Sequence, residues 1–128
     1  MNEYLQSVSN AAVYAAGDAA GTGAPKLTPV SSMDGHVAAT NMLEGNRRKP
    51  DYTEVPSVVF TVPPLASVGL LEKTAAAQGL AFDVHHEDTS GWYASRRVGM
   101  KHTAFKVLVE MGTGRILGAH VLGFDAEE

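Results

Sequence analysis

The stretch Thr103-Ala-Phe-Lys-Val-Leu-Val-Glu-Met-Gly-Thr-Gly-Arg-Ile-Leu-Gly-Ala-His-Val-Leu122 decides the fold of the second half of this chain. It contains two apolar-alternating runs, residues 103–110 and 115–122, joined by four residues that include two glycines. Alternation with period two is typical of strands, and glycine in a short connection is typical of a tight turn. The stretch therefore predicts a β-hairpin.

Upstream of the hairpin, the pattern predicts two further strands and one helix. The strands are residues 58–62, closed by Pro63-Pro64, and residues 81–87. The helix covers residues 67–78, with Ser67 as its cap and Gly79 as its end. The order strand, helix, strand, hairpin predicts an α+β module, an antiparallel sheet with helices on one face.

The first 50 residues carry a different pattern, a β-loop-α unit. Residues 11–16 are a short apolar run that predicts a buried strand, and residues 19–27 form a loop of Gly, Ala, Thr and Pro. Thr28-Pro29 predicts a helix start, with Thr28 as cap, and Gly45-Asn46 predicts its end. The apolar positions at helical spacing are Val30, Met33, Val37, Ala38 and Met42. One such unit cannot bury both faces of its strand, so residues 1–50 are predicted to be part of a larger domain.

Residues 46–56 are polar and charged with prolines at 50 and 56, which predicts a linker. We therefore expect two domains, residues 1–50 and residues 51–128. The last residues also predict an interrupted element, because Asp125 followed by acidic residues is typical of a helix start. We expect the chain to be a truncated part of a longer protein.

The composition excludes several function classes. An apolar content of 45% with 19% charged residues among 128 is that of a folded protein, and a net charge of −4 argues against nucleic acid as a partner. No apolar run is long enough to span a bilayer, and the first residues lack the pattern of a signal peptide, so we expect no membrane partner and a cytoplasmic location. Cysteine is absent, which rules out a disulfide or a thiolate nucleophile within these residues.

Few residues suggest chemistry by themselves. Asp18 follows a strand and a glycine and could accept hydrogen bonds from a ligand hydroxyl, although the residues by themselves favour a plain Gly-Asp turn with no ligand. The helix start at Leu27-Thr28 could face a negatively charged oxygen or could be an ordinary cap. His85 and His86 are neighbours in a predicted strand and point to opposite faces, so we predict no metal site.

Several segments together resemble the pyridine nucleotide–disulfide oxidoreductases, which include glutathione reductase, dihydrolipoamide dehydrogenase and mercuric reductase. Asn10-Ala-Ala-Val-Tyr-Ala-Ala-Gly-Asp18 resembles the second flavin-binding motif of this family, and Lys26-Leu-Thr-Pro-Val30 resembles its Leu-Thr-Pro segment. Pro56-Ser-Val-Val-Phe-Thr-Val-Pro-Pro-Leu-Ala-Ser-Val-Gly69 and residues 105–123 resemble the opening and the central hairpin of its dimerisation domain.

The resemblance implies a cofactor, FAD, and four cofactor-binding residues: Gly17, Asp18, Leu27 and Thr28. Asp18 would contact the ribityl chain, while the amides of Leu27 and Thr28 would face the pyrimidine side of the flavin ring. It also implies that residues 1–50 are the end of an FAD domain and that residues 51–128 form the dimerisation domain of a homodimer.

The family's dinucleotide fingerprint, redox cysteine pair, NAD(P)H domain and late His-Pro-Thr motif are all missing from the sequence. We therefore assign no catalytic residue. The resemblance implies a parent enzyme that passes electrons from NAD(P)H through FAD to a disulfide or related acceptor, of which this segment would be an inactive part. A free-standing dimerisation or binding module without redox activity is the alternative.

Overall fold

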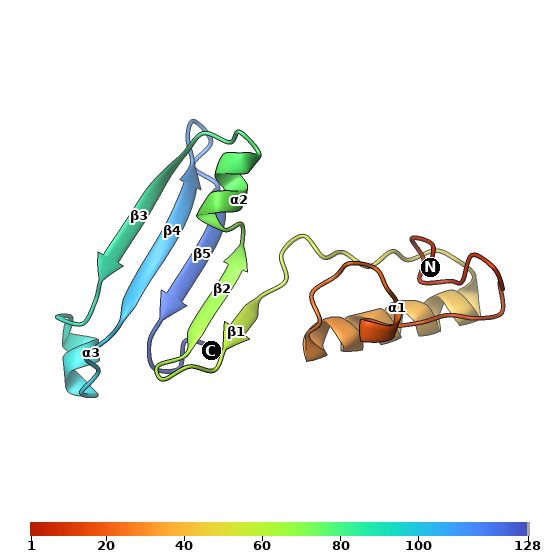
Figure 1. Ribbon diagram of the computed structural model, residues 1–128, viewed down its shortest axis with the longest axis horizontal. Coiled ribbons are helices and arrows are strands. Elements are labelled where there is room, and N and C mark those ends of the chain that lie inside the picture. Colours follow the sequence, from red (N-terminus) through yellow and green to blue (C-terminus); the bar gives the residue numbers. More distant parts are fainter. Residues whose placement is uncertain (128) are drawn as a thin grey trace. The chain divides into compact units, whose positions relative to one another are not determined.

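The computed structural model describes residues 1–127, which form two compact units, Met1–Val55 and a second unit that begins at Pro56 (Figure 1). The elements are η1 (Gly17–Ala19), α1 (Thr28–Glu44), β1 (Ser57–Val59), β2 (Leu65–Gly69), α2 (Glu72–Ala77), β3 (Phe82–Asp88), α3 (Tyr93–Arg97), β4 (Ala104–Glu110) and β5 (Ile116–Leu122). None of the helices in residues 1–127 has the length and apolar character needed to cross a membrane.

The second unit is a five-stranded sheet in the order β1-β2-β5-β4-β3, in which every neighbouring pair is antiparallel. The α+β class is confirmed. The hairpin predicted from residues 103–122 is confirmed as β4 and β5, the centre of the sheet. Gly112 and Gly114 in its turn both have positive φ angles, which L side chains rarely adopt. A register shift between Leu108 and Val109 adds a bulge to the pair.

The helix predicted over residues 67–78 is wrong in its first part. Residues 65–69 form β2, and Ser67, the predicted cap, pairs with His120 in β5 and hydrogen-bonds Ser57 of β1 at 2.9 Å. Only Glu72–Ala77 is helical. β1 is also shorter than the predicted strand of residues 58–62 and begins one residue earlier. The reason is tertiary, because β2 gains strand partners on both sides that a local pattern cannot reveal.

The two faces of the sheet differ in character. On one face α2 lies over the sheet, with Glu72 forming a 2.9 Å ion pair to Lys106 of β4. On the other face, the edge strand β3 contributes Asp83, His85 and Glu87. The alternate residues of the other four strands on that face are apolar, and we call this set the open apolar face. Its members are Val58, Ala66, Val68, Phe105, Val107, Val109, Ala119 and Val121. The helix α2 lies on the opposite side of the sheet and does not cover this face.

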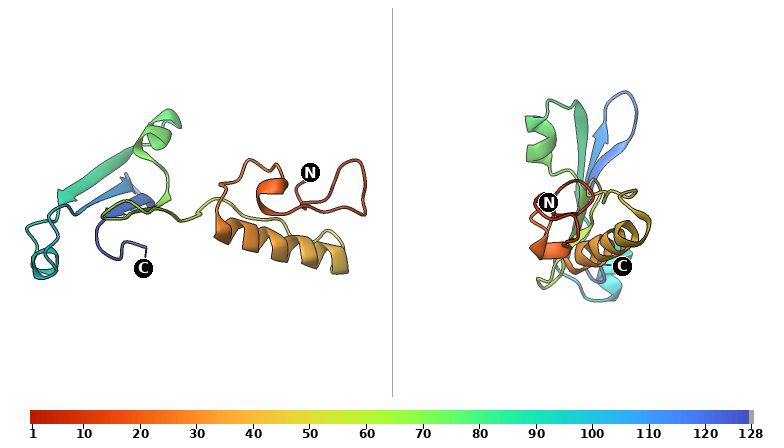
Figure 2. Two further views of the ribbon diagram at one scale, coloured as in Figure 1. Left: turned by 60° about the horizontal axis from the view of Figure 1, so that its bottom comes forward. Right: turned by 90° about the vertical axis from the view of Figure 1, so that its right-hand side faces the viewer.

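The first unit is built around α1, along which the N-terminal loops run (Figure 2). Leu5, Ala20, Val37 and Ala38 form its buried apolar core. The predicted helix is confirmed, and its buried stripe consists of Val30, Asp34, Val37, Ala38 and Asn41. Met42 also falls at helical spacing but is not part of this stripe, because its side chain is 59% exposed while Asn41 is buried.

The strand predicted over residues 11–16 is wrong. The segment makes a single isolated bridge, between Tyr14 and Gln6, together with backbone hydrogen bonds such as Ala15 N–H to the Leu5 carbonyl at 3.0 Å. A segment with one neighbour and no sheet to join lacks the repeated pairing that defines a strand. The β-loop-α unit is therefore a loop-α unit in this chain.

The segment 46–55, predicted as a linker, is packed onto the first unit. The backbone N–H groups of Arg47 and Arg48 donate to the Asn41 side chain at 3.0 and 2.9 Å, and Lys49 pairs with Glu3 at 2.7 Å. The division of the chain into two units therefore falls between Val55 and Pro56, five residues after the predicted boundary.

At the other end of the chain, Asp125 is not a helix N-cap. Its φ of 51° differs from the extended backbone of a cap, and residues 124–127 form turns. Residue 128 lies outside the described residues.

Candidate functional site

The Gly17–Asp18 turn is held tightly against the first turn of α1. Gly17 has a φ of 59°, and a Cβ atom at this position would lie 2.5 Å from the Ser31 Oγ. Glycine is therefore required here for both backbone conformation and space. Asp18, the next residue, is exposed, so its carboxylate is accessible to a ligand.

Beneath the turn lies a buried carboxyl group, Asp34 of α1. One of its oxygens accepts a 3.0 Å hydrogen bond from the Gly17 N–H, and the other accepts a 2.8 Å hydrogen bond from the Tyr52 hydroxyl. Burial raises the pKa of the Tyr52 phenol above its ordinary value; the hydrogen bond to Asp34 acts in the same direction, and the neighbouring Thr22 side chain opposes it. Tyr52 therefore keeps its proton and remains a donor at neutral pH.

A small hollow of about 70 Å³ opens beside the turn. Its lining residues are Gly17, Asp18, Gly21, Thr22, Gly23, Ala24, Pro25, Lys26 and Val30. It brings together two of the four predicted cofactor residues, Gly17 and Asp18, and adds Lys26. Leu27 and Thr28 lie outside the lining, at the adjoining helix start. The hollow can take only part of a large ligand.

The start of α1 differs in detail from the prediction. Leu27, with extended backbone angles of −129° and 143°, takes the N-cap position, and Thr28 is the first helical residue. Thr28 is therefore not the cap, and no side-chain cap hydrogen bond is made there. The positive end of the helix dipole still lies at Leu27 and Thr28, where it favours negative charge.

Sequence reasoning missed Asp34 and Tyr52. Asp34 lies on the buried stripe of α1, whose members are residues 30, 34, 37, 38 and 41. This helical spacing predicts the burial of Asp34 if polar residues are counted as possible members of the stripe. A carboxyl group is stable in a core only where hydrogen-bond donors reach it. The donors to Asp34 are Gly17 and Tyr52, which are distant in the sequence, so the pattern of apolar residues alone could not predict its burial.

Metal ligation finds no support in residues 1–127. Within this range no three His, Cys, Asp or Glu side chains come together in a group that could hold an ion. His85 and His86 are successive residues of β3 and so point to opposite faces of the sheet.

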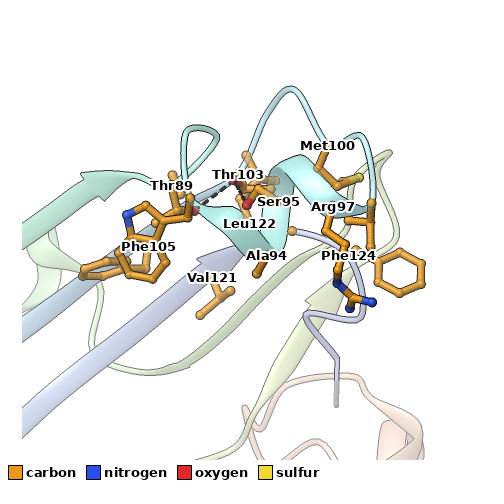
Figure 3. A pocket seen from close by; sticks show the side chains of 14 residues that line it. Thr89, Ala94, Ser95, Arg97, Met100, Thr103, Phe105, Val121, Leu122 and Phe124 are labelled. Carbon is orange, nitrogen blue, oxygen red and sulfur yellow. Dashed lines mark hydrogen bonds between the residues drawn. The ribbon is translucent and has the colours of Figure 1, made fainter.

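A larger hollow, of about 310 Å³, lies in the second unit between α3 and the ends of β4 and β5 (Figure 3). Trp92 packs against Phe105 at one side, with 6.1 Å between ring centroids. At its inner side Thr103 Oγ1 lies 2.9 Å from both the Thr89 and the Ser95 hydroxyl oxygens, so these hydroxyls satisfy one another. This chain of hydroxyls fixes α3 to the sheet.

Residues 55–128 match the family model described as pyridine nucleotide-disulphide oxidoreductase, dimerisation domain. The whole chain is 48% identical to an uncharacterized 19.7 kDa protein in the mercuric resistance operon of Staphylococcus aureus, of which it covers 71%. It is 36% identical over 128 residues to the chloroplastic/mitochondrial glutathione reductase of Pisum sativum and 36% identical over 124 residues to the mercuric reductase of Streptomyces lividans. It spans only 23% and 25% of those two proteins.

Solved structures show the same relationship. The HOCl-induced flavoprotein disulfide reductase RclA from Escherichia coli matches with a TM-score of 0.82 and 26% identity, over 98% of this chain and 28% of that one. LpdA from Mycobacterium tuberculosis matches with a TM-score of 0.83 and 25% identity, over 99% of this chain and 27% of that one. The chain thus spans about a quarter of the full reductases it resembles.

Proposed function

The chain belongs to the pyridine nucleotide-disulphide oxidoreductase family of flavin-dependent enzymes, and from this premise we propose that it supplies one wall of an FAD site and a dimer interface. In the complete enzyme, electrons would pass from NAD(P)H through FAD to a disulfide or related acceptor. The observation that carries the proposal is the Gly17–Asp18 turn, whose backbone is fixed against α1 while the Asp18 carboxylate stays exposed.

The residues present fit one part of FAD. The exposed Asp18 carboxylate can accept hydrogen bonds from ribityl hydroxyls. Thr28 begins a 17-residue helix whose positive end suits the negative charge of a reduced flavin, while the Leu27 N–H already donates to the Pro25 carbonyl at 3.0 Å. Bound flavin would supply the electron transfer. This chain would orient the cofactor and hold no redox disulfide of its own, because it contains no cysteine.

The purified chain is expected to retain no flavin. The hollow beside Asp18 has a volume of only about 70 Å³, whereas pockets that bury a drug-sized ligand are several times larger, about 300–1,000 Å³. Visible absorption and fluorescence of the supernatant after denaturation would measure any released flavin. Near-stoichiometric flavin would show that this chain holds FAD without further walls.

The second unit is proposed to form a homodimer. The support is the match of residues 55–128 to a dimerisation domain and the open apolar face, where eight uncharged side chains lie on four adjoining strands. An apolar patch on four strands can bury its surface against its own copy across a two-fold axis, and the Asp83 and Glu87 carboxylates of β3 would lie at the edge of that contact. We expect light scattering coupled to size-exclusion chromatography to give twice the mass of 13.5 kDa.

Two glutamate substitutions test which face is used. Val121, 44% exposed, lies on the open apolar face, and Val84, 42% exposed, lies on the opposite face. Val121→Glu is expected to weaken dimerisation by about tenfold or more, because it would place an unpaired charge in the interface. Val84→Glu should leave it unchanged. Equal effects, or a stronger effect of Val84→Glu, would exclude the open apolar face.

The alternative is a free-standing dimerisation or binding module. It is favoured by the Staphylococcus aureus relative, which at 19.7 kDa is mostly covered by this chain, whereas the chain covers about a quarter of the reductases. The mass of the native gene product, measured in an extract of the host, distinguishes a free-standing module from part of a complete reductase. A product near 20 kDa supports the module, and a product about four times the length of this chain supports the reductase.

A further inference from the structure

We propose that Asp34 and Tyr52 are positioning residues that fix the Gly17–Asp18 turn, so that the Asp18 carboxylate is presented to its ligand in one orientation. The inference rests on the proposed flavin contact of Asp18. It adds two residues, 16 and 34 positions further along the chain, that touch no ligand themselves.

Asp34 is suited to this role because its side chain is completely buried and each of its oxygens has one donor. The Gly17 N–H lies 3.0 Å from one oxygen and the Tyr52 hydroxyl lies 2.8 Å from the other. A buried carboxyl group is costly unless its oxygens accept hydrogen bonds. Moving either donor away would therefore carry a penalty, and the turn is held to a rigid helix.

The turn itself has little room to move. Ser31 packs directly against Gly17, and the Ala20 N–H closes the turn on the Gly17 carbonyl at 2.9 Å. Ala20 is buried in the core of the first unit. The backbone on either side of Asp18 is thus fixed at three points, while Asp18 itself is exposed. This is the arrangement expected of a site whose scaffold is preorganised.

Tyr52 connects the turn to the segment that follows α1. Its hydroxyl reaches Asp34, and Thr22 of the glycine-bearing loop lies beside it. Thr22 and Asp18 both line the hollow. Loss of the Tyr52 hydroxyl is therefore expected to affect Gly17 through Asp34.

Amide hydrogen exchange followed by NMR on the full 128-residue chain tests the proposal. In Asp34→Ala the Gly17 amide is expected to exchange about tenfold faster, since it loses its acceptor, while the amides of Val37 and Ala38 in α1 change much less. Asp34→Asn keeps an acceptor oxygen and should restore most of the protection. Tyr52→Phe should accelerate Gly17 exchange severalfold without removing the carboxyl group.

Tyr14→Phe is the matched control. It removes a hydroxyl from the same unit, one that donates to Asn46 at 2.8 Å and not to the Gly17–Asp18 turn. Gly17 exchange should not respond to it. The proposal is overturned if Asp34→Ala leaves the Gly17 amide protected. It is also overturned if Tyr52→Phe accelerates exchange uniformly across the unit, because Tyr52 would then be an ordinary core residue.

Added FAD separates the positioning role from the flavin contact. A change in the Asp18 amide resonance of the wild-type chain that is lost in Asp34→Ala supports both ideas. The same change persisting in Asp34→Ala contradicts the positioning role. Absence of any change in the wild-type chain counts against the proposed flavin contact, while the exchange measurement still decides whether Asp34 and Tyr52 fix the turn.

Discussion

Replacing Gly118 by alanine is expected to unfold the second unit. Gly118 is buried in β5, where an added Cβ atom would lie 2.1 Å from the Leu70 carbonyl oxygen, a backbone atom. The Leu70 N–H donates to the Leu117 carbonyl at 2.8 Å, so neither backbone segment can move apart without breaking the hydrogen bonding at the end of the β2–β5 pair. Overpacking of this kind costs about 3 kcal/mol or more, a large part of the stability of a small domain.

The single tryptophan of the chain, Trp92, belongs to the second unit and makes its unfolding visible. Urea titration followed by tryptophan fluorescence should show the midpoint of Gly118→Ala shifted far below that of the wild type. Gly91→Ala is the control, because a Cβ atom at Gly91 would meet nothing within 4 Å. A wild-type midpoint for Gly118→Ala would mean that Leu70 does not pack on β5 as described.

Replacing Asn41 by alanine is expected to remove about 3 kcal/mol from the first unit. The Asn41 side chain is 1% exposed and makes four hydrogen bonds to backbone groups. It donates to the carbonyls of Tyr4 and Arg48 and accepts from the N–H groups of Arg47 and Arg48. Each lost bond costs about 1 kcal/mol, and partly buried backbone groups would be left without partners.

Hydrogen exchange of the α1 amides measures this loss, while Trp92 fluorescence reports on the second unit as an internal reference. Asn10→Ala is the matched control, because Asn10 is exposed and its side chain bonds only a nearby backbone N–H, that of Ala12. It should cost less than about 1 kcal/mol. Similar exchange rates in Asn41→Ala and Asn10→Ala would show that the segment after α1 is held without the Asn41 side chain.

Some residues of the candidate site could be predicted from neighbouring residues in the sequence, and others could not. Gly17 and Asp18 could be proposed from sequence because a Gly-Asp turn and a helix start are short patterns of adjacent residues. Leu27 and Thr28 were correctly placed at that helix start, although the cap was assigned to the wrong one of them. Asp34 and Tyr52 were missed because their role depends on hydrogen bonds between residues distant in the sequence: Asp34 bonds Gly17, 17 residues away, and Tyr52, 18 residues away.

The sequence alone determined the β4–β5 hairpin, the span of α1 and the resemblance to flavin-dependent reductases. These depend on periodicity, turn glycines and capping, which act between neighbouring residues. Tertiary structure alone decided that residues 65–69 form a strand, that residues 11–16 do not, and that the segment 46–55 belongs to the first unit. In each case the structure of the segment depends on whether groups distant in the sequence supply a hydrogen-bond partner. The pattern of neighbouring residues does not indicate whether that partner is present.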